Sequence, residues 1–132
     1  MLCVKPTENL SLEKDILSKC AVMGKEPRLI TAVEDNEILG YIAVDLILGE
    51  ERIIAFNISG CENYDHPTGV QWEIADYLIR TAGNYAMNRG VVKLTTDLES
   101  KFTLFRLFKF TELDNKFTVY LKDLFKKCEN CS

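Results

Sequence analysis

The segment GVQWEIADYLIRTAGNYAMNRGVVKL, residues 69–94, carries the clearest structural pattern of the chain. Apolar residues recur in it at steps of three and four, which predicts a long amphipathic helix with one face against a core. These positions are Val70, Ile74, Ala75, Leu78, Ile79, Ala82, Tyr85 and Ala86. Gly90 can adopt the left-handed conformation that ends a helix, and an extended apolar run begins directly after it. The segment therefore predicts a helix followed by a buried strand, one unit of an α/β layer.

Three strands are expected before this helix. Residues 28–33, 38–44 and 52–58 are rich in β-branched and other apolar side chains, and short polar turns at 34–37 and 49–51 separate them. Strands joined by such short turns run antiparallel, so the pattern predicts a meander. The second and third runs are almost continuously apolar, which indicates that layers cover both faces of the sheet.

Further elements are expected on both sides of this unit. Residues 11–23 have helical periodicity, with Asn9 or Ser11 as the N-cap and Gly24 as the terminator. Residues 2–4 can form a brief edge strand before Pro6. A short helix is expected over 101–109 and a final hairpin over 110–121.

Composition limits the possible functions. The 132 residues suit a single domain, residues 1–132, and 47% of them are hydrophobic. A net charge of -4 argues against binding to nucleic acid or to anionic membranes, which requires a basic excess. No window approaches the ~20 apolar residues of a membrane span. The N-terminal residues lack the pattern of a signal peptide, so a cytoplasmic location is expected.

The cysteines give little sign of a disulfide framework. There are five, at scattered positions, which favours free thiols in a reducing compartment. Cys128 and Cys131 form a Cys-x-x-Cys pair, which can be half of a zinc site or a redox pair. Because the chain has no second such pair, no metal site is predicted. A thiol or metal function for this pair is kept as a weaker alternative.

Two stretches carry a resemblance to a known family. LIRTAGNYAMNRGVVKL, residues 78–94, resembles the central helix and following strand of the GNAT superfamily of acyl-CoA-dependent N-acyltransferases. In that family the helix commonly reads as a Leu-Leu pair, then Tyr-Ala, then Arg-Gly. LFRLFKF, residues 104–110, resembles the closing helix and turn, which usually ends in Gly-Phe. The resemblance spans roughly the whole chain. It implies an α/β (α+β) fold with a mixed, mostly antiparallel sheet flanked by helices.

The resemblance also implies a function and a cofactor. The function is an acetyl-CoA-dependent N-acetyltransferase acting on an amine of a small molecule or peptide. Family members hold the coenzyme A pyrophosphate at the start of the central helix, through a loop patterned Gln/Arg-x-x-Gly-x-Gly/Ala. Alignment on Leu78-Ile79 places this pattern at residues 70–75, where only Ala75 fits and Glu73 replaces the first glycine. The expected cofactor-binding residues are Ile58, Ser59, Gly69, Val70, Gln71, Trp72, Glu73, Ile74 and Ala75.

Two alternatives for this site stay open. In one, Gly69 is the loop glycine, the helix starts about a turn earlier, and His66 faces a phosphate. In the other, the segment is a plain helix start, with Glu73 near its third or fourth position complementing the helix dipole. A carboxylate beside a diphosphate is repulsive, so Glu73 counts against coenzyme binding.

The catalytic residues remain unassigned. Many family members donate a proton from a tyrosine at the position held here by Phe105, and Lys109 replaces the glycine before Phe110. Tyr77 or Tyr120 could substitute as the acid. Candidate bases are Asp45, Glu62, Asp65 and His66. The alternative function is therefore a catalytically inactive GNAT-like module that binds a ligand or a protein, with a degraded coenzyme A site. Two copies could pair through an exposed edge strand or the C-terminal hairpin.

Overall fold

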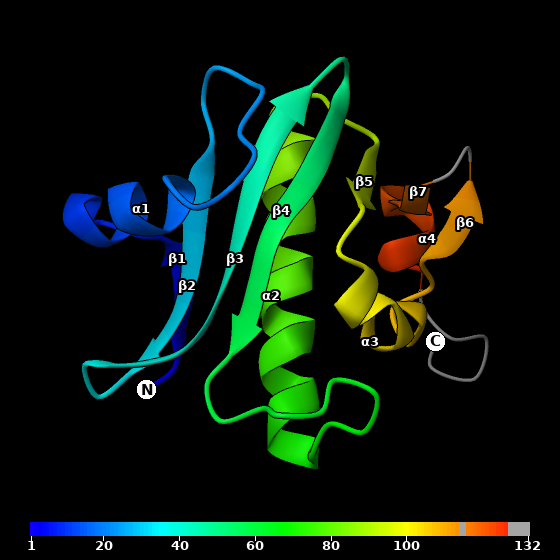
Figure 1. Ribbon diagram of the computed structural model, residues 1–132. Helices are drawn as coiled ribbons and strands as arrows, with labels where there is room; N and C mark the ends of the chain where they lie inside the picture. The colour runs from blue at the N-terminus through cyan, green and yellow to red at the C-terminus, as the bar shows by residue number, and fades with distance from the viewer. Residues whose placement is uncertain (114–115, 127–132) are drawn as a thin grey trace.

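The computed structural model describes residues 1–113 and 116–126, which form one mixed seven-stranded sheet with helices on both faces (Figure 1). The strand order is β1-β2-β3-β4-β5-β7-β6, and every pair is antiparallel except β4 with β5. The strands are β1 Cys3–Pro6, β2 Arg28–Glu34, β3 Glu37–Ile47, β4 Glu50–Ile58, β5 Lys93–Thr96, β6 Thr111–Leu113 and β7 Lys116–Tyr120. The helices are α1 Leu10–Leu17, α2 Gly69–Asn88, the 3₁₀ turn η1 Glu99–Lys101, α3 Phe102–Arg106 and α4 Leu121–Leu124.

The predicted meander is confirmed as β2, β3 and β4. Both of its turns are two residues long and have positive φ at each central residue, Asp35 with Asn36 and Leu48 with Gly49. This backbone matches the twist of the strands on either side, so the strands can pair up to the turn. The edge strand β1 and the final hairpin of β6 and β7 are also present.

The two faces of the sheet bury separate sets of side chains. The apolar stripe of α2 packs on one face together with α3 and α4, and the fully buried Leu78, Ile79 and Phe105 belong to this larger core. The smaller set lies on the α1 face and consists of Leu29, Ala43 and Ile54 beneath α1. Val70 departs from the predicted stripe, since it lies in the first turn of α2 and is exposed.

The first helix is shorter than the sequence predicts. It begins after the expected N-cap Asn9 but ends at Leu17 instead of continuing to residue 23. The reason lies in β3, where the carboxylate of the fully buried Asp45 accepts hydrogen bonds from the backbone N–H groups of Met23 and Gly24, at 2.8 to 3.1 Å. These bonds hold residues 23–24 against the sheet, so the helix stops before them.

Two further boundaries differ from the prediction. The turn after α2 includes Val91, whose N–H bonds to the Ala86 carbonyl at 3.0 Å, so β5 starts at Lys93. The short helix α4 follows β7, where only a strand is expected from the pattern. In both cases backbone N–H and C=O groups form hydrogen bonds within a turn or a helix, so they are not available for pairing between strands.

Among the described residues, no helix combines the length and the apolar character needed to cross a membrane.

Candidate functional site

The sheet opens between its two parallel strands. β4 and β5 pair at only three positions, Glu51 with Leu94, Arg52 with Thr95 and Ile53 with Thr96. Beyond these pairs β4 continues to Ile58, whereas the chain after Thr96 turns away into η1 and α3 (Figure 1). Ile54 is an extra residue in β4, because the β3 register shifts there. The strands therefore diverge at their carboxyl ends, the usual place for ligands in sheets with parallel strands.

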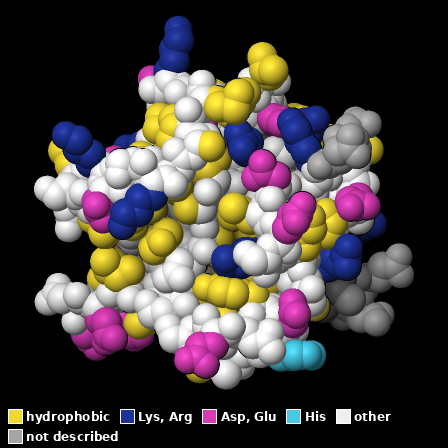
Figure 2. Space-filling view, in the orientation of Figure 1, with side chains coloured by type: hydrophobic (Ala, Val, Ile, Leu, Met, Phe, Trp, Pro, Cys, Tyr) yellow, Lys and Arg dark blue, Asp and Glu magenta, His cyan; other side chains and the backbone are white. Residues whose placement is uncertain are grey.

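A cleft of about 390 Å³ occupies this opening on the α1 face. It is lined by residues 54–57 of β4, by Leu98 and Lys101 after β5, and by residues of the α1 segment that include Cys20. Burial raises the pKa of the Cys20 thiol, so this cysteine is a poor nucleophile here. Figure 2 shows the face of the molecule opposite α2, where acidic and basic side chains are interspersed and neither sign forms a continuous patch.

Tyr64, from the loop between β4 and α2, lies over the free edge of β4. The N–H of Ser59 donates to the Leu39 carbonyl of β3, so the N–H of Ile58 points to the other side, toward the opening. There it donates to the Tyr64 hydroxyl at 3.0 Å, and this hydroxyl lies 3.3 Å from Asn57 Oδ1. Burial is the main reason that the pKa of Tyr64 is raised.

Lys101 reaches Tyr64 from the other side of the opening. Its Nζ lies 4.6 Å from the centroid of the Tyr64 ring, a cation–π contact. The Tyr64 ring also meets Phe56 edge-on, with the centroids 6.3 Å apart. Lys101 lines the cleft, and its contact with the Tyr64 ring joins η1 to the loop beside the free edge of β4.

The start of α2 lies at the same end of the sheet as this opening (Figure 1). A capping box stabilises the start of the helix. Thr68 Oγ1 accepts the Gln71 N–H at 3.1 Å, and Gln71 Oε1 accepts the Thr68 N–H at 2.9 Å. Trp72 N–H makes the first helical bond, to the Thr68 carbonyl. Within the described part of the chain, the N–H groups of Gly69 and Val70 are left as donors at the helix start.

Glu73 lies neither in a loop before the helix nor at the third or fourth position of the helix. Because α2 begins at Gly69, Glu73 is its fifth residue, in the second turn, and its side chain is exposed. The helix start agrees with the alternative in which Gly69 is the loop glycine, and the first turn contains no acidic residue. His66 is exposed in the loop before it.

The other predicted cofactor-binding residues face in several directions. Ile74 and Ala75 are buried in the core beneath α2. The Ser59 hydroxyl donates to the Ile38 carbonyl, which ties this residue to β3 and away from the opening. Trp72 stacks on Phe108 with centroids 5.4 Å apart, and so joins the start of α2 to the turn after α3.

The catalytic candidates from the sequence are buried, bonded elsewhere or exposed away from the opening between β4 and β5. Phe105 is fully buried against Phe56, with centroids 5.3 Å apart, and has no proton to donate. Tyr120 pairs with Lys93 at the far end of β5, and Tyr77 is exposed on α2. Asp45 is engaged by backbone amides. Glu62 and Asp65 are exposed in the loop that carries Tyr64.

Sequence reasoning missed Tyr64 and Lys101. The only signal for Tyr64 was an aromatic residue inside an otherwise polar loop. Among residues 1–113 and 116–126, no group of three or more His, Cys, Asp or Glu side chains is placed to hold a metal ion. Cys128 and Cys131 lie outside the described residues, so their proposed role stays a prediction.

Comparison with known proteins identifies solved structures with the same architecture. No protein-family model matches the chain, and no curated protein matches it. Solved structures do match. The ribosomal-protein-S18-alanine N-acetyltransferase from Escherichia coli has a TM-score of 0.63 at 12% identity, over 92% of this chain and 94% of that one. An aminoglycoside 6'-acetyltransferase type Ii has a TM-score of 0.62 at 13% identity, over 90% and 97%.

A third structure is a GNAT family acetyltransferase from Elizabethkingia anophelis with acetyl-CoA bound. Its TM-score is 0.60 at 13% identity, and the match covers 90% of this chain and 97% of that one. These matches define the class of fold: the chain has the GNAT fold, with its mixed sheet and flanking helices. The resemblance found in the sequence is therefore confirmed at the level of the fold.

Proposed function

We propose that this protein binds acetyl-CoA and transfers its acetyl group to an amine of a small molecule or peptide. The observation that carries the proposal is the divergence of β4 from β5 after the Ile53–Thr96 pair, with α2 beginning at the same end. Solved acetyltransferases with this fold support it, and one of them holds acetyl-CoA. Fold alone does not define an activity, so the residues have to be tested against the cofactor.

The residues at the opening fit the cofactor in part. The N–H groups of Gly69 and Val70, at the positive end of a 20-residue helix, would hold the pyrophosphate. The free edge of β4 up to Ile58 offers backbone groups for the amides of the pantetheine arm. Tyr64 takes the Ile58 N–H, so it has to leave this edge before the arm can use it.

Bound in this way, acetyl-CoA would supply the thioester carbonyl that an amine attacks. The protein would hold the two reactants in position, a contribution that does not require a strong acid in the site. Phe105 makes no proton available, so protonation of the leaving thiolate falls to solvent.

A transfer assay tests the activity. Purified protein is incubated with acetyl-CoA and a mixture of amines, and both free thiol release and acetylated products are measured. We expect thiol release that depends on the added amine, with a product of matching mass. Thiol release at the rate of buffer alone, across all amines, would rule out the transferase.

A second candidate function is a GNAT-fold module that no longer binds the coenzyme. The observation that favours it is the occupied edge of β4, where the Tyr64 hydroxyl accepts the Ile58 N–H and the Tyr64 ring makes a cation–π contact with Lys101. In that case the loop would hold its position when acetyl-CoA is added. The two candidates therefore differ in one observable, the environment of Tyr64 with and without the coenzyme.

A further inference from the structure

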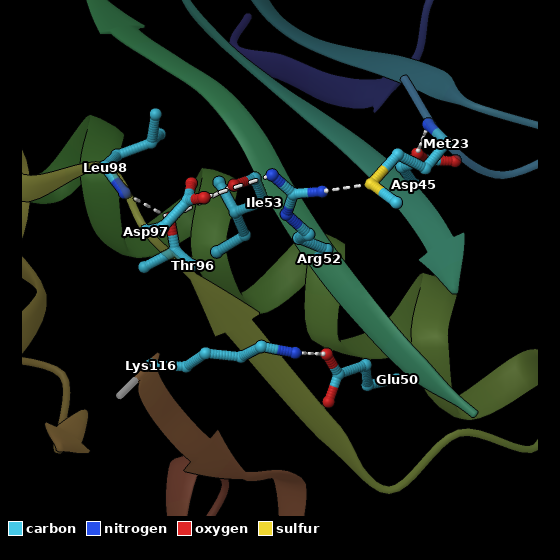
Figure 3. A network of polar contacts seen from close by, with 9 residues as sticks. All are labelled: Met23, Asp45, Glu50, Arg52, Ile53, Thr96, Asp97, Leu98 and Lys116. Atoms are coloured by element: carbon cyan, nitrogen blue, oxygen red, sulfur yellow. Dashed lines mark hydrogen bonds and ion pairs between the residues drawn. The ribbon is translucent and has the colours of Figure 1, made fainter. Parts of the chain in front are cut away.

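A second cleft, of about 250 Å³, adjoins the opening on the α1 face. It lies beside the last paired residues of β4 and β5 and is lined by Arg52, Thr95, Asp97 and Lys116 among others. Figure 3 shows Arg52, Asp97 and Lys116. Asp97 follows directly after β5, so it lies at the end of the cleft nearest the opening. Lys116 and Glu50 lie at the other end, away from the opening (Figure 3).

Arg52 is held by one strong and one weak acceptor. Its side chain is only 17% exposed, and one terminal nitrogen donates to Asp97 Oδ2 at 3.1 Å. The other donates to the Met23 sulfur at 3.4 Å, and a thioether is a weak acceptor. Met23 is itself mostly exposed, and it is kept near Arg52 because its backbone N–H bonds to Asp45. A carboxylate entering the cleft can displace the sulfur and form a stronger, charge-assisted bond.

Thr95 places a buried hydroxyl beside Arg52. It is 1% exposed, and its hydroxyl makes no hydrogen bond of good geometry among the described residues, although it lies close enough to the Glu50 carboxylate to help lower the pKa of Glu50. A buried hydroxyl with a poorly aligned partner is stabilised when it bonds to a better acceptor. Thr95 is the cross-strand neighbour of Arg52 and lines the same cleft, so a carboxylate bound to Arg52 would lie beside it.

The charges around the cleft balance. Three cationic side chains line or adjoin the cleft, namely Lys93, Lys116 and Arg52. Three carboxylates do the same, namely Glu50, Asp97 and Asp45. Glu50 is bonded to Lys116 at 2.6 Å and paired with Lys93 at 3.6 Å. Partial burial would raise the pKa of Glu50, but the bond and charge of Lys116, the charge of Lys93 and a weaker hydrogen-bonding effect of Thr95 outweigh it and lower the pKa. Asp45 is satisfied by backbone N–H groups.

Asp97 is the remaining carboxylate, and its side chain is 61% exposed. A ligand with a single charge would upset the balance of the cleft, whereas a zwitterion with an anionic and a cationic end would keep it. The anionic end matches Arg52 and Thr95, and the cationic end matches Asp97 beside the opening.

We propose that this cleft binds the acceptor and that the acceptor is a small amino carboxylic acid. Its carboxylate bonds to Arg52 and Thr95, and its ammonium lies at Asp97, facing the opening between β4 and β5. The reaction rests on the proposed function, whereas binding of the acid does not. In the transfer, the ammonium gives one proton to Asp97, the amine attacks the thioester carbonyl to form the C–N bond, and the C–S bond breaks. The nitrogen then loses its second proton to solvent, and the thiolate takes a proton from solvent.

The test is a titration of isotope-labelled protein, followed by NMR and without coenzyme. The probes are 4-aminobutyrate, butylamine and butyrate, which share a chain but differ in their charged ends. We expect 4-aminobutyrate to shift the amide signals of Arg52, Thr95 and Asp97 saturably. The two singly charged probes should bind about tenfold more weakly or worse, since each lacks one charge-assisted contact.

Variants locate the binding site. Arg52→Met should weaken 4-aminobutyrate binding by about tenfold or more, as loss of a charge-assisted bond predicts. Met23→Leu removes only the competing sulfur and should leave the affinity unchanged or raise it. The matched control is Arg80→Met, because Arg80 pairs with Asp76 on the exposed face of α2. It should have no effect.

Three outcomes would overturn the proposal. They are butylamine binding as tightly as 4-aminobutyrate, shifts that do not saturate, and Arg52→Met binding like the parent while its spectrum shows an intact fold. Failure of the transferase proposal looks different, because it appears as absent thiol release whether or not 4-aminobutyrate binds.

Discussion

At the residue scale, Glu51 is a carboxyl group in an unfavourable place. It has no exposed surface, and within the described part of the chain neither of its oxygens has a hydrogen-bond partner. Burial raises the pKa of Glu51 to about 7, against an ordinary value of 4.5; Arg89 opposes the shift and Asp45 adds to it. The group is therefore protonated in the folded protein over a range where it ionises in the unfolded chain.

This pKa predicts how stability depends on pH. Below pH 4.5 the carboxyl is protonated in both states, and between 4.5 and 7 the folded state binds the extra proton. The free energy of unfolding should therefore fall as pH rises through this window, by up to about 3 kcal/mol from this group. Glu51→Gln should flatten the fall and be more stable than the parent at pH 8, measured by urea unfolding.

The control for this prediction is Glu34→Gln, since Glu34 is exposed at the end of β2. It should keep the pH dependence of the parent. If Glu51→Gln and Glu34→Gln gave the same profile, the burial of Glu51 would not be the cause.

Tyr64 gives a second prediction at this scale. Tyr64→Phe keeps the ring beneath Lys101 but removes the hydroxyl that holds the Ile58 N–H. We expect it to bind acetyl-CoA about threefold to tenfold more tightly, because one competing hydrogen bond of about 1 kcal/mol is lost. Isothermal titration calorimetry measures this, with Tyr77→Phe on the exposed side of α2 as the control. A weaker affinity would mean that the hydroxyl helps to bind the coenzyme.

Single residues were the hardest part to predict from the sequence. The absence of an acid at Phe105 could be read from the aligned turn. Tyr64, Arg52 and Thr95 could not be singled out, because their significance comes from neighbours elsewhere in the sheet. Arg52 and Asp97, for example, are 45 residues apart, and only the β4–β5 pairing brings them together.

At the element scale, the start of α2 decides whether an anion can bind. The capping box uses two of the groups there, and the donors of Gly69 and Val70 remain. Glu73 lies one turn further on and is exposed, so its charge is felt mainly through solvent.

Glu73→Gln should therefore raise the affinity for acetyl-CoA by a modest factor, about twofold to fivefold, and more at low salt than at high salt. Glutamine keeps the helix, whereas glycine would cost about 1 kcal/mol of stability there. Titrations at two salt concentrations, with Glu34→Gln as the control, check this. An effect of the same size at both salt concentrations would show that the charge of Glu73 is not responsible.

The elements themselves were largely predictable. Periodicity and turn residues gave the meander, α2 and the final hairpin, because these depend on neighbours within a few positions. The end of α1 was wrong by several residues, since the buried Asp45 of β3 stops it from a distance. The end of α2 and the start of β5 depend on one backbone bond from Val91, which periodicity does not show.

At the scale of the whole molecule, the distinguishing feature of the fold is a single parallel pair of strands, β4 and β5, in an otherwise antiparallel sheet. The GNAT resemblance predicted this architecture, and the solved structures confirm it. Local pattern alone would have given strands without their order, because β7 lies between β5 and β6. A cytoplasmic location, and pairing of two copies through an exposed edge, stay predictions.

The most direct test of the account is to add acetyl-CoA to labelled protein and map the amide signals that move. We predict saturable shifts at Gly69 and Val70 and along β4 to Ile58, with a change at Tyr64 as its hydroxyl leaves the strand. At a hundredfold excess over its dissociation constant, the coenzyme should also stabilise the fold by about 2.7 kcal/mol. Unchanged signals at the start of α2 and along β4, together with an unchanged melting temperature, would contradict the account.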